Sequence, residues 1–195
     1  MILSGFLSQI RRGRSLIVAG TPASTLFRSY NGSNSNDSGG FTLSLGFKFT
    51  VASGKTLTMT AIGAYAANGA APPSGITVTA KVATIADPTT ILASATFTDS
   101  DFGDLDATNR VMTKAVSASL AAGDYVIWTY GYGPPYKAYA TDGSSPAGSN
   151  PVNDGITNVT RDASNDRYNA GSTAAPGSTN SPQQYGGPTF KGYTT

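Results

Sequence analysis

The chain has 195 residues, a formal net charge of +2, no cysteine and no histidine. Its length suits one large β domain, and the missing cysteine excludes disulfides and zinc–thiolate sites. The missing histidine removes the side chain that most often acts as general base, so most hydrolase mechanisms are not expected. The small net charge also argues against a dedicated nucleic-acid binder, in which a basic stripe would be expected.

The composition favours strands joined by turns. Glycine (23 residues) and proline (11) are abundant, only 12% of residues are charged, and all 11 acidic residues are aspartate. Glutamate, the commonest acidic helix former, is absent, whereas aspartate favours turns. We therefore expect an all-β fold.

Residues 1–40 are expected to form an N-terminal arm and linker. Apolar residues spaced by three and four could form a short amphipathic helix, with a disordered terminus as the alternative. The arm carries an arginine cluster, and residues 31–40 contain only turn-forming residues. The charges follow the apolar stretch, the wrong order for a secretion signal. The partner-binding residues predicted here are Phe6, Ile10, Arg11, Arg12 and Arg14.

Residues 41–195 are expected to form the β domain. In 41–51 the apolar residues occupy every second position, and 57–65 continues this period, so the two segments are predicted to form a hairpin. Four further strands are expected at 76–82, 91–97, 110–120 and 124–132. Residues 133–187 are rich in glycine, proline and serine but contain scattered tyrosines, which predicts a long ordered loop region followed by a closing strand at 188–194. The predicted class is an antiparallel β-sandwich, jelly-roll-like.

The order of five motifs resembles an uncharacterised β-sandwich domain that recurs in bacterial secreted and surface-anchored proteins and in some phage particle proteins. The resemblance implies that the strand after LAAG lies in the core, that the C-terminus returns to the sheet, and that no catalytic residue can be carried over. No signal peptide and no sorting anchor are expected, which argues against a surface-anchored role and favours the phage particle proteins. The motifs are LGFKFTV (45–51), LTMTAIGAY (57–65), TTILASATF (89–97), LAAGDYVI (120–127) and YGGPTF (185–190).

One acidic cluster is a candidate for binding calcium, which prefers oxygen-rich loops. It departs from the EF-hand pattern, because Gly103 and Arg110 occupy positions that need oxygen ligands. A solvated turn is the main interpretation, and catalysis by paired carboxylates is disfavoured because the acids share one loop. No other metal and no cofactor is expected. The cluster consists of Asp99, Asp101, Asp104 and Asp106.

Aromatic residues between 128 and 139 are the second candidate surface, since exposed rings stack on sugars or fill partner pockets. Trp128, Tyr130 and Tyr132 share one face of a predicted strand, which usually indicates core packing. The residues predicted to be exposed are Tyr132, Tyr136 and Tyr139.

Two functions fit these features. The first is a non-enzymatic virion structural protein, namely a capsid decoration or cement protein of a bacteriophage that anchors to the shell through its arm. Its partners would be the major capsid protein or other virion proteins, and further copies of the chain in a homo-oligomer. The alternative is a secreted or cell-surface carbohydrate-binding or adhesion module with a host glycan as ligand. No stretch is long enough to span a membrane.

Overall fold

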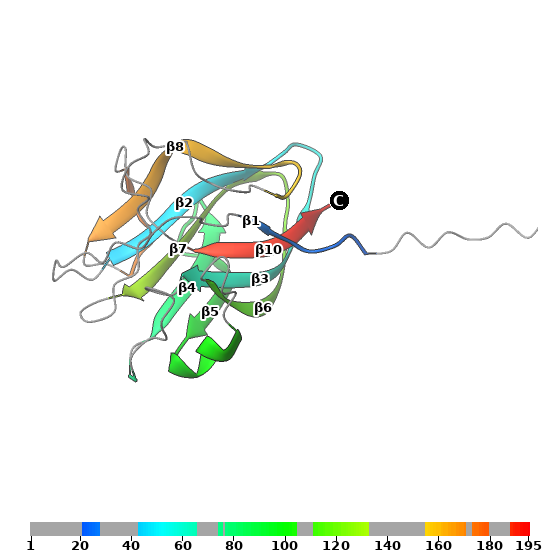
Figure 1. Cartoon of the computed structure of the whole chain (residues 1–195). Helices are drawn as coiled ribbons and strands as arrows, with labels where there is room; N and C mark the ends of the chain where they lie inside the picture. The colour runs from blue at the N-terminus through cyan, green and yellow to red at the C-terminus, as the bar shows by residue number, and fades with distance from the viewer. Residues whose placement is uncertain are drawn as a thin grey trace, which may run out of the picture.

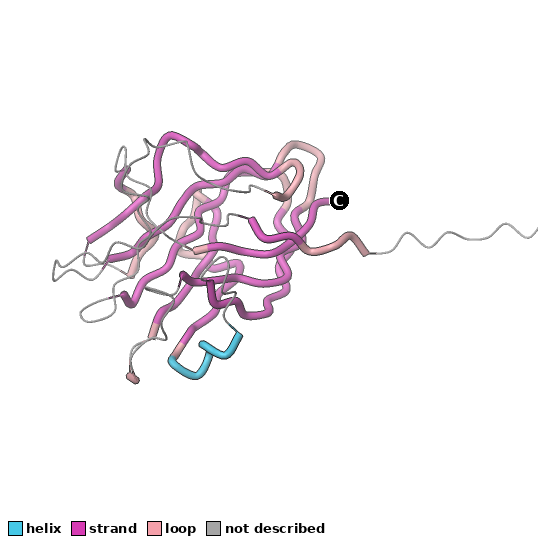
Figure 2. Tube along the Cα trace, viewed as in Figure 1, coloured by secondary structure: helices cyan, strands magenta, loops and turns pink. Residues whose placement is uncertain are grey.

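The chain is an antiparallel β-sandwich. The computed structural model describes residues 21–27, 43–65, 74–75, 77–104, 111–132, 155–170, 173–179 and 188–195. These residues form one short 3-10 helix, η2 (Asp99–Asp104), and strands in two sheets (Figures 1 and 2). The strands are β1 (Thr25–Phe27), β2 (Leu43–Val51), β3 (Leu57–Tyr65), β4 (Val78–Thr84), β5 (Ile91–Phe97), β6 (Val111–Leu120), β7 (Gly123–Tyr132), β8 (Val159–Ala170), β9 (Ser178–Thr179) and β10 (Thr189–Thr194).

The strand order has the nested pairing of a jelly roll. One sheet has the order β1-β10-β3-β6 and the other β5-β4-β7-β2-β8-β9. The antiparallel pairs are β1 with β10, β2 with β7, β3 with β6 and β4 with β5, so the chain folds like one long hairpin rolled over itself. Strands β8 and β9 extend the second sheet beyond β2. The predicted all-β, jelly-roll-like sandwich is confirmed.

The core lies between the two sheets and is rich in aromatic rings. Every second residue of β2 is apolar, so Phe47 and Phe49 point inward and are fully buried. Phe27 of β1 lies 6.0 Å from Phe47 of β2 in the opposite sheet, and Phe190 of β10 lies 5.0 Å from Phe49 of β2, measured between ring centroids. Rings from both sheets therefore interdigitate and hold the sandwich closed without disulfides.

The predicted hairpin of 41–51 with 57–65 is wrong. Strand β2 pairs with β7 and β8, whereas β3 pairs with β10 and β6 in the opposite sheet. The turn at 52–56 carries the chain from one sheet to the other, which lets apolar side chains of both strands face each other across the core. Local alternation is the same in a hairpin and in such a crossing, so it does not identify the partner strand.

The observed strands also differ from the predicted boundaries of the N-terminal arm and of the C-terminal loop region. Residues 25–27, assigned to the arm, form β1 and contribute Phe27 to the core. Residues 133–187, assigned to a loop region, contain the twelve-residue strand β8 and the short strand β9. The predicted closing strand at 188–194 is confirmed, because β10 covers Thr189–Thr194.

The six-stranded sheet is covered on its outer face as well. Trp128 is 1% exposed and packs with Ala83 and Val126 on the side opposite the main core. Its indole Nε1 donates a hydrogen bond to the carbonyl oxygen of Thr173 at 3.3 Å, and the segment that follows packs Ala175 against the same cluster. Strand β7 is therefore apolar on both faces, as expected for a strand buried on both sides.

Candidate functional site

All five predicted partner-binding residues lie outside the described residues, as do several other predicted site residues. Phe6, Ile10, Arg11, Arg12 and Arg14 precede residue 21, and Asp106, Tyr136 and Tyr139 fall in undescribed segments. Tyr132 ends β7 and Asp104 ends η2, but only their backbone positions are described. The structure therefore informs on two parts of the predicted sites: the acidic segment around η2 and the aromatic face of β7.

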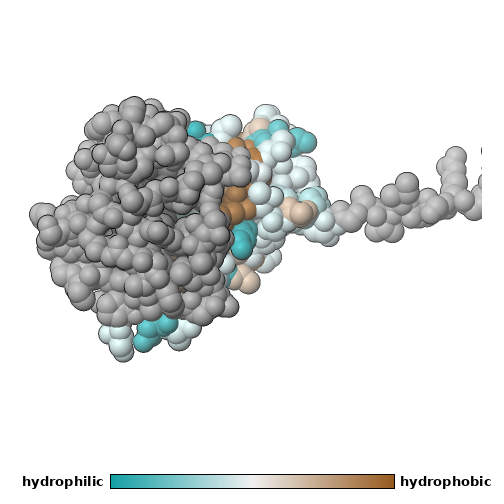
Figure 3. Space-filling view, in the orientation of Figure 1, coloured by the Kyte–Doolittle hydropathy of each residue, from teal (hydrophilic) through white to brown (hydrophobic). Residues whose placement is uncertain are grey.

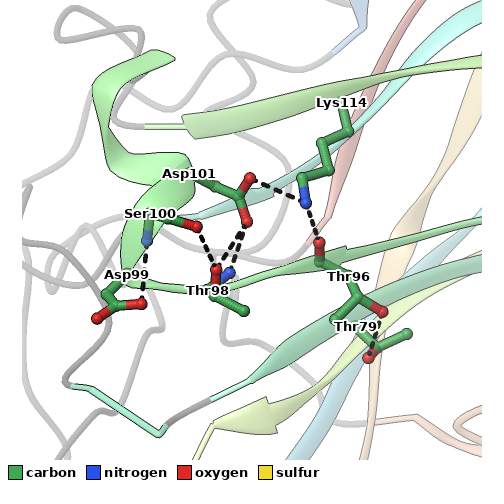
Figure 4. Close-up of polar contacts among 7 residues, drawn as sticks. All are labelled: Thr79, Thr96, Thr98, Asp99, Ser100, Asp101 and Lys114. Carbon is green, nitrogen blue, oxygen red and sulfur yellow. Dashed lines mark hydrogen bonds and ion pairs between the residues drawn. The ribbon is translucent and has the colours of Figure 1, made fainter.

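The acidic segment begins with a local capping arrangement (Figure 4). The Asp101 carboxylate accepts a hydrogen bond from the backbone N–H of Thr98 at 2.7 Å and from its hydroxyl at 3.2 Å. The backbone N–H of Asp101 in turn donates to the Thr98 carbonyl at 3.1 Å. This reciprocal pattern is typical of residues that start a helical turn, so it fixes η2 directly after β5.

Lys114 joins this turn to the opposite sheet. Its Nζ lies 2.9 Å from Asp101 Oδ1 and donates a hydrogen bond to the Thr96 carbonyl oxygen. Its ammonium also lies 5.6 Å from the centre of the Phe97 ring. Lys114 belongs to β6 and Thr96 to β5, which are edge strands of different sheets that contact each other (Figure 1). Lys114 therefore links the two sheets at the edge formed by β5 and β6.

The electrostatics of Asp101 suit a structural role. Partial burial raises the pKa of Asp101, but the hydrogen bonds from Lys114 and Thr98 outweigh it and hold the pKa below its ordinary value. The carboxylate is therefore ionised at neutral pH and already engaged. Asp99 is exposed and accepts a hydrogen bond from the Ser100 backbone N–H at 3.0 Å. Within the described ranges no three acidic, histidine or cysteine side chains gather around a common point. The calcium hypothesis stays a prediction that would involve Asp104 and Asp106.

We expect Asp101→Asn to lower the free energy of unfolding by about 1 to 2 kcal/mol at neutral pH, because charged hydrogen bonds are lost. The folded pKa of Asp101 lies below its ordinary value of 3.8, so its contribution is present above pH ~4 and disappears as the pH falls through the folded pKa. The difference between wild type and variant should therefore shrink as the pH falls below 3.8. Urea unfolding at several pH values measures it, with the exposed Asp99→Asn as control. A difference independent of pH would contradict this assignment.

The aromatic face of β7 is mostly packed. Trp128 is buried, which confirms the core interpretation for this residue. Tyr130 is half-buried, and the ammonium of Lys81 lies 4.9 Å from the centre of its ring. Among the described rings on this face of β7, Tyr130 is thus the one that a ligand could contact. A signal for this burial was present in the sequence, because residues 125–128 are apolar at consecutive positions.

The described surface includes two open depressions that bear on function. One has a volume of about 450 Å³ and lies where β4 ends and β7 begins, lined by Thr84, Ile85, Ala86, Ala122, Gly123, Asp124 and Tyr125. The other, of about 200 Å³, lies beside β1 and the end of β10 and is lined partly by Pro22, Thr157 and Tyr193. The part of the described surface visible in Figure 3 is mostly pale or teal with one brown strip, so large apolar areas are few in that view.

Comparisons with known proteins found no match, so any functional proposal is based on the sequence, the fold and the contacts described above. No protein-family model, curated protein or solved structure matches the chain. The resemblance to phage and bacterial surface domains, expected from the order of the sequence motifs, therefore stays a prediction. Among the described residues, no helix has the length and apolar character needed to cross a membrane.

Proposed function

We propose that the chain is a non-enzymatic structural protein of a bacteriophage virion, which decorates or cements the capsid and attaches through its N-terminal segment. The observation that carries this proposal is the way β1 joins that segment to the body. Thr25–Phe27 pair with β10, and the fully buried Phe27 ring fixes the strand in the aromatic core. An attachment segment rooted in the core transmits a load directly to the whole domain.

The charge distribution supports the same function. Arg11, Arg12 and Arg14 lie among apolar residues N-terminal to β1, so the segment could contact acidic and apolar protein surfaces. In the described body, Asp87 and Asp101 are held by threonine and lysine partners, as in a structural domain. Jelly rolls occur in viral capsid and lectin domains, which is an argument by fold analogy.

The alternative is a secreted or surface carbohydrate-binding module. The half-buried Tyr130 and the depression beside Tyr125 are the features that favour it. Sugar stacking usually needs an exposed ring, and the large indole of Trp128 is covered on this face. Because this indole is covered, we place the virion function first. A glycan array separates the two functions, since only the carbohydrate-binding module needs a glycan.

Mass spectrometry of purified phage particles tests the proposal. We expect the chain in copies on the order of hundreds if it covers the shell, and about a dozen or fewer if it occupies a tail or portal position. A chain shortened to start at Thr21 keeps β1 and should bind particles at least about tenfold less. Ala115→Ser, an exposed change on β6, should bind like wild type. Absence of the wild-type chain from particles would refute the virion function.

A further inference from the structure

The start of β5 carries an exposed apolar pair. Ile91 and Leu92 are 38% and 39% exposed, and they are the large hydrophobic side chains of the described chain that remain exposed. Strand β5 is the edge of the six-stranded sheet, paired with β4. Contiguous exposed apolar side chains rimmed by polar residues often mark protein contacts. We call Asp87, Ile91 and Leu92 the β5 patch.

The edge of β5 is unsuited to adding another strand. Val82 pairs with Ala93 and Ala83 with Ile91, so Leu92 is an extra residue in a bulge. At the other end of the strand, the Thr96 carbonyl oxygen accepts a hydrogen bond from Lys114. Bulges and lysines are the devices that block pairing at sheet edges. A partner of this patch is therefore recognised by side chains.

The polar part of the β5 patch is an anion. Asp87 is fully exposed in the turn between β4 and β5, and its carboxylate accepts hydrogen bonds from the backbone N–H and hydroxyl of Thr89 and from the hydroxyl of Thr90. These bonds lower the pKa of Asp87 to about 2, so the group is charged at neutral pH. Next to this turn lies the depression that includes Ile85 and Asp124. Asp124 is already paired with Lys48 at 3.9 Å, so the negative charge of the β5 patch comes from Asp87.

We propose that the β5 patch of one molecule binds residues 1–20 of a second copy of this chain. The chemistry is complementary: the segment supplies apolar side chains for Ile91 and Leu92, and guanidinium groups for Asp87. Arginine suits such a carboxylate because its planar donors bind oxygen pairs. The contributing residues of the segment are Ile2, Leu3, Phe6, Leu7, Ile10, Arg11, Arg12 and Arg14.

The topology favours a second copy over the segment's own body. Strand β1, which the segment precedes, is one edge of the four-stranded sheet, and β6 is the other. The β5 patch lies on the side of β6, because β5 contacts β6 across the sandwich. The root of the segment and the patch thus occupy opposite edges, and a head-to-tail contact between neighbours joins them. Such contacts repeat from copy to copy.

This inference rests on the proposed function in one respect: residues 1–20 remain the attachment segment. The partner that we assign to this segment is the β5 patch of a second copy. Copies linked in this way would reinforce a shell through many weak contacts. The two proposals fail separately. If the chain is found on particles but its self-association does not depend on the β5 patch, only the inference is refuted. If the chain self-associates through the patch but is absent from particles, only the virion function is refuted.

Sedimentation of the full chain between about 1 and 100 µM tests the inference. We expect concentration-dependent association, weakened at least about tenfold by Leu92→Ser and by the double change Arg11→Ser and Arg12→Ser. A mixture of the two variants should form dimers, because one carries an intact segment and the other an intact patch. Binding of the segment to its own body would give no association in any sample, which overturns the proposal.

Matched controls separate the patch from general surface effects. Ala115→Ser changes an exposed residue on β6, and Asp99→Asn removes an exposed carboxylate beyond the other end of β5. Both should associate like wild type, whereas Asp87→Asn should weaken association and reduce its dependence on salt. Equal weakening by Asp87→Asn and Asp99→Asn, or wild-type association of Leu92→Ser, would refute the β5 patch. Urea unfolding of each variant confirms that it is folded.

Discussion

Gly46→Ala is expected to lower the free energy of unfolding by about 3 kcal/mol or to prevent folding. Gly46 of β2 lies directly opposite Trp128 of β7. A Cβ atom at Gly46 would lie 2.2 Å from the carbonyl oxygen of Ile127 and 2.7 Å from the Cβ of Trp128. Both distances are far below van der Waals contact, so the two strands would have to separate.

The surroundings of Gly46 leave little room for such a movement. Strand β7 is hydrogen-bonded to β2 on one side and to β4 on the other, so it cannot shift without breaking a second ladder. One face of β7 packs in the aromatic core and the other under the segment that contains Thr173. Overpacking at a site fixed on all sides is usually costly, since neighbours cannot relax.

Gly177→Ala is the matched control, because a Cβ at Gly177 meets no atom within 4 Å. Urea unfolding followed by the fluorescence of Trp128, the sole tryptophan, measures both variants. We expect Gly177→Ala to unfold within about 0.5 kcal/mol of wild type. Equal stability of the two variants would show that β2 and β7 do not approach each other this closely.

The sequence predicts those strands whose side chains alternate between core and solvent. In β2, Phe47 and Phe49 follow this rule, so the strand and its buried face were predictable. Strand β8 was missed because its sequence, VTRDASNDRYNA, is polar at most positions. Its pairing with β2 depends on main-chain hydrogen bonds, which every residue except proline can make. Composition therefore does not reveal such a strand.

The candidate site shows the same limit. The sequence locates the acidic cluster, but not the partner of Asp101, because Lys114 follows 13 residues later on another strand. Only the topology, in which β6 of one sheet lies beside β5 of the other, brings the ammonium to the carboxylate. Likewise, Ile91 and Leu92 belong to a segment that alternates like a buried strand, and the bulge at Leu92 leaves both exposed. Long-range pairing and irregular register are not local properties.

The boundary between attachment segment and body depends on Phe27. The sequence placed this residue in the arm, because the turn-rich residues 31–40 separate it from the regular strands. In the structure its ring lies 6.0 Å from that of Phe47 and 4.7 Å from that of Phe190, and its carbonyl oxygen accepts a hydrogen bond from the Thr189 hydroxyl. A three-residue strand has few backbone hydrogen bonds, so the buried ring supplies much of its stability.

Phe27→Ala is therefore expected to lower the free energy of unfolding by about 4 kcal/mol, because the truncated ring leaves a cavity between the two sheets. Thr25→Ala is the control: this residue belongs to the same strand but is exposed, and its variant should remain within about 0.5 kcal/mol of wild type. Urea unfolding at neutral pH compares them. If Phe27→Ala matched Thr25→Ala, β1 would not be fixed in the core, and the proposed attachment segment would lose its rigid root. A large loss confined to Phe27→Ala would place the start of the folded body at β1.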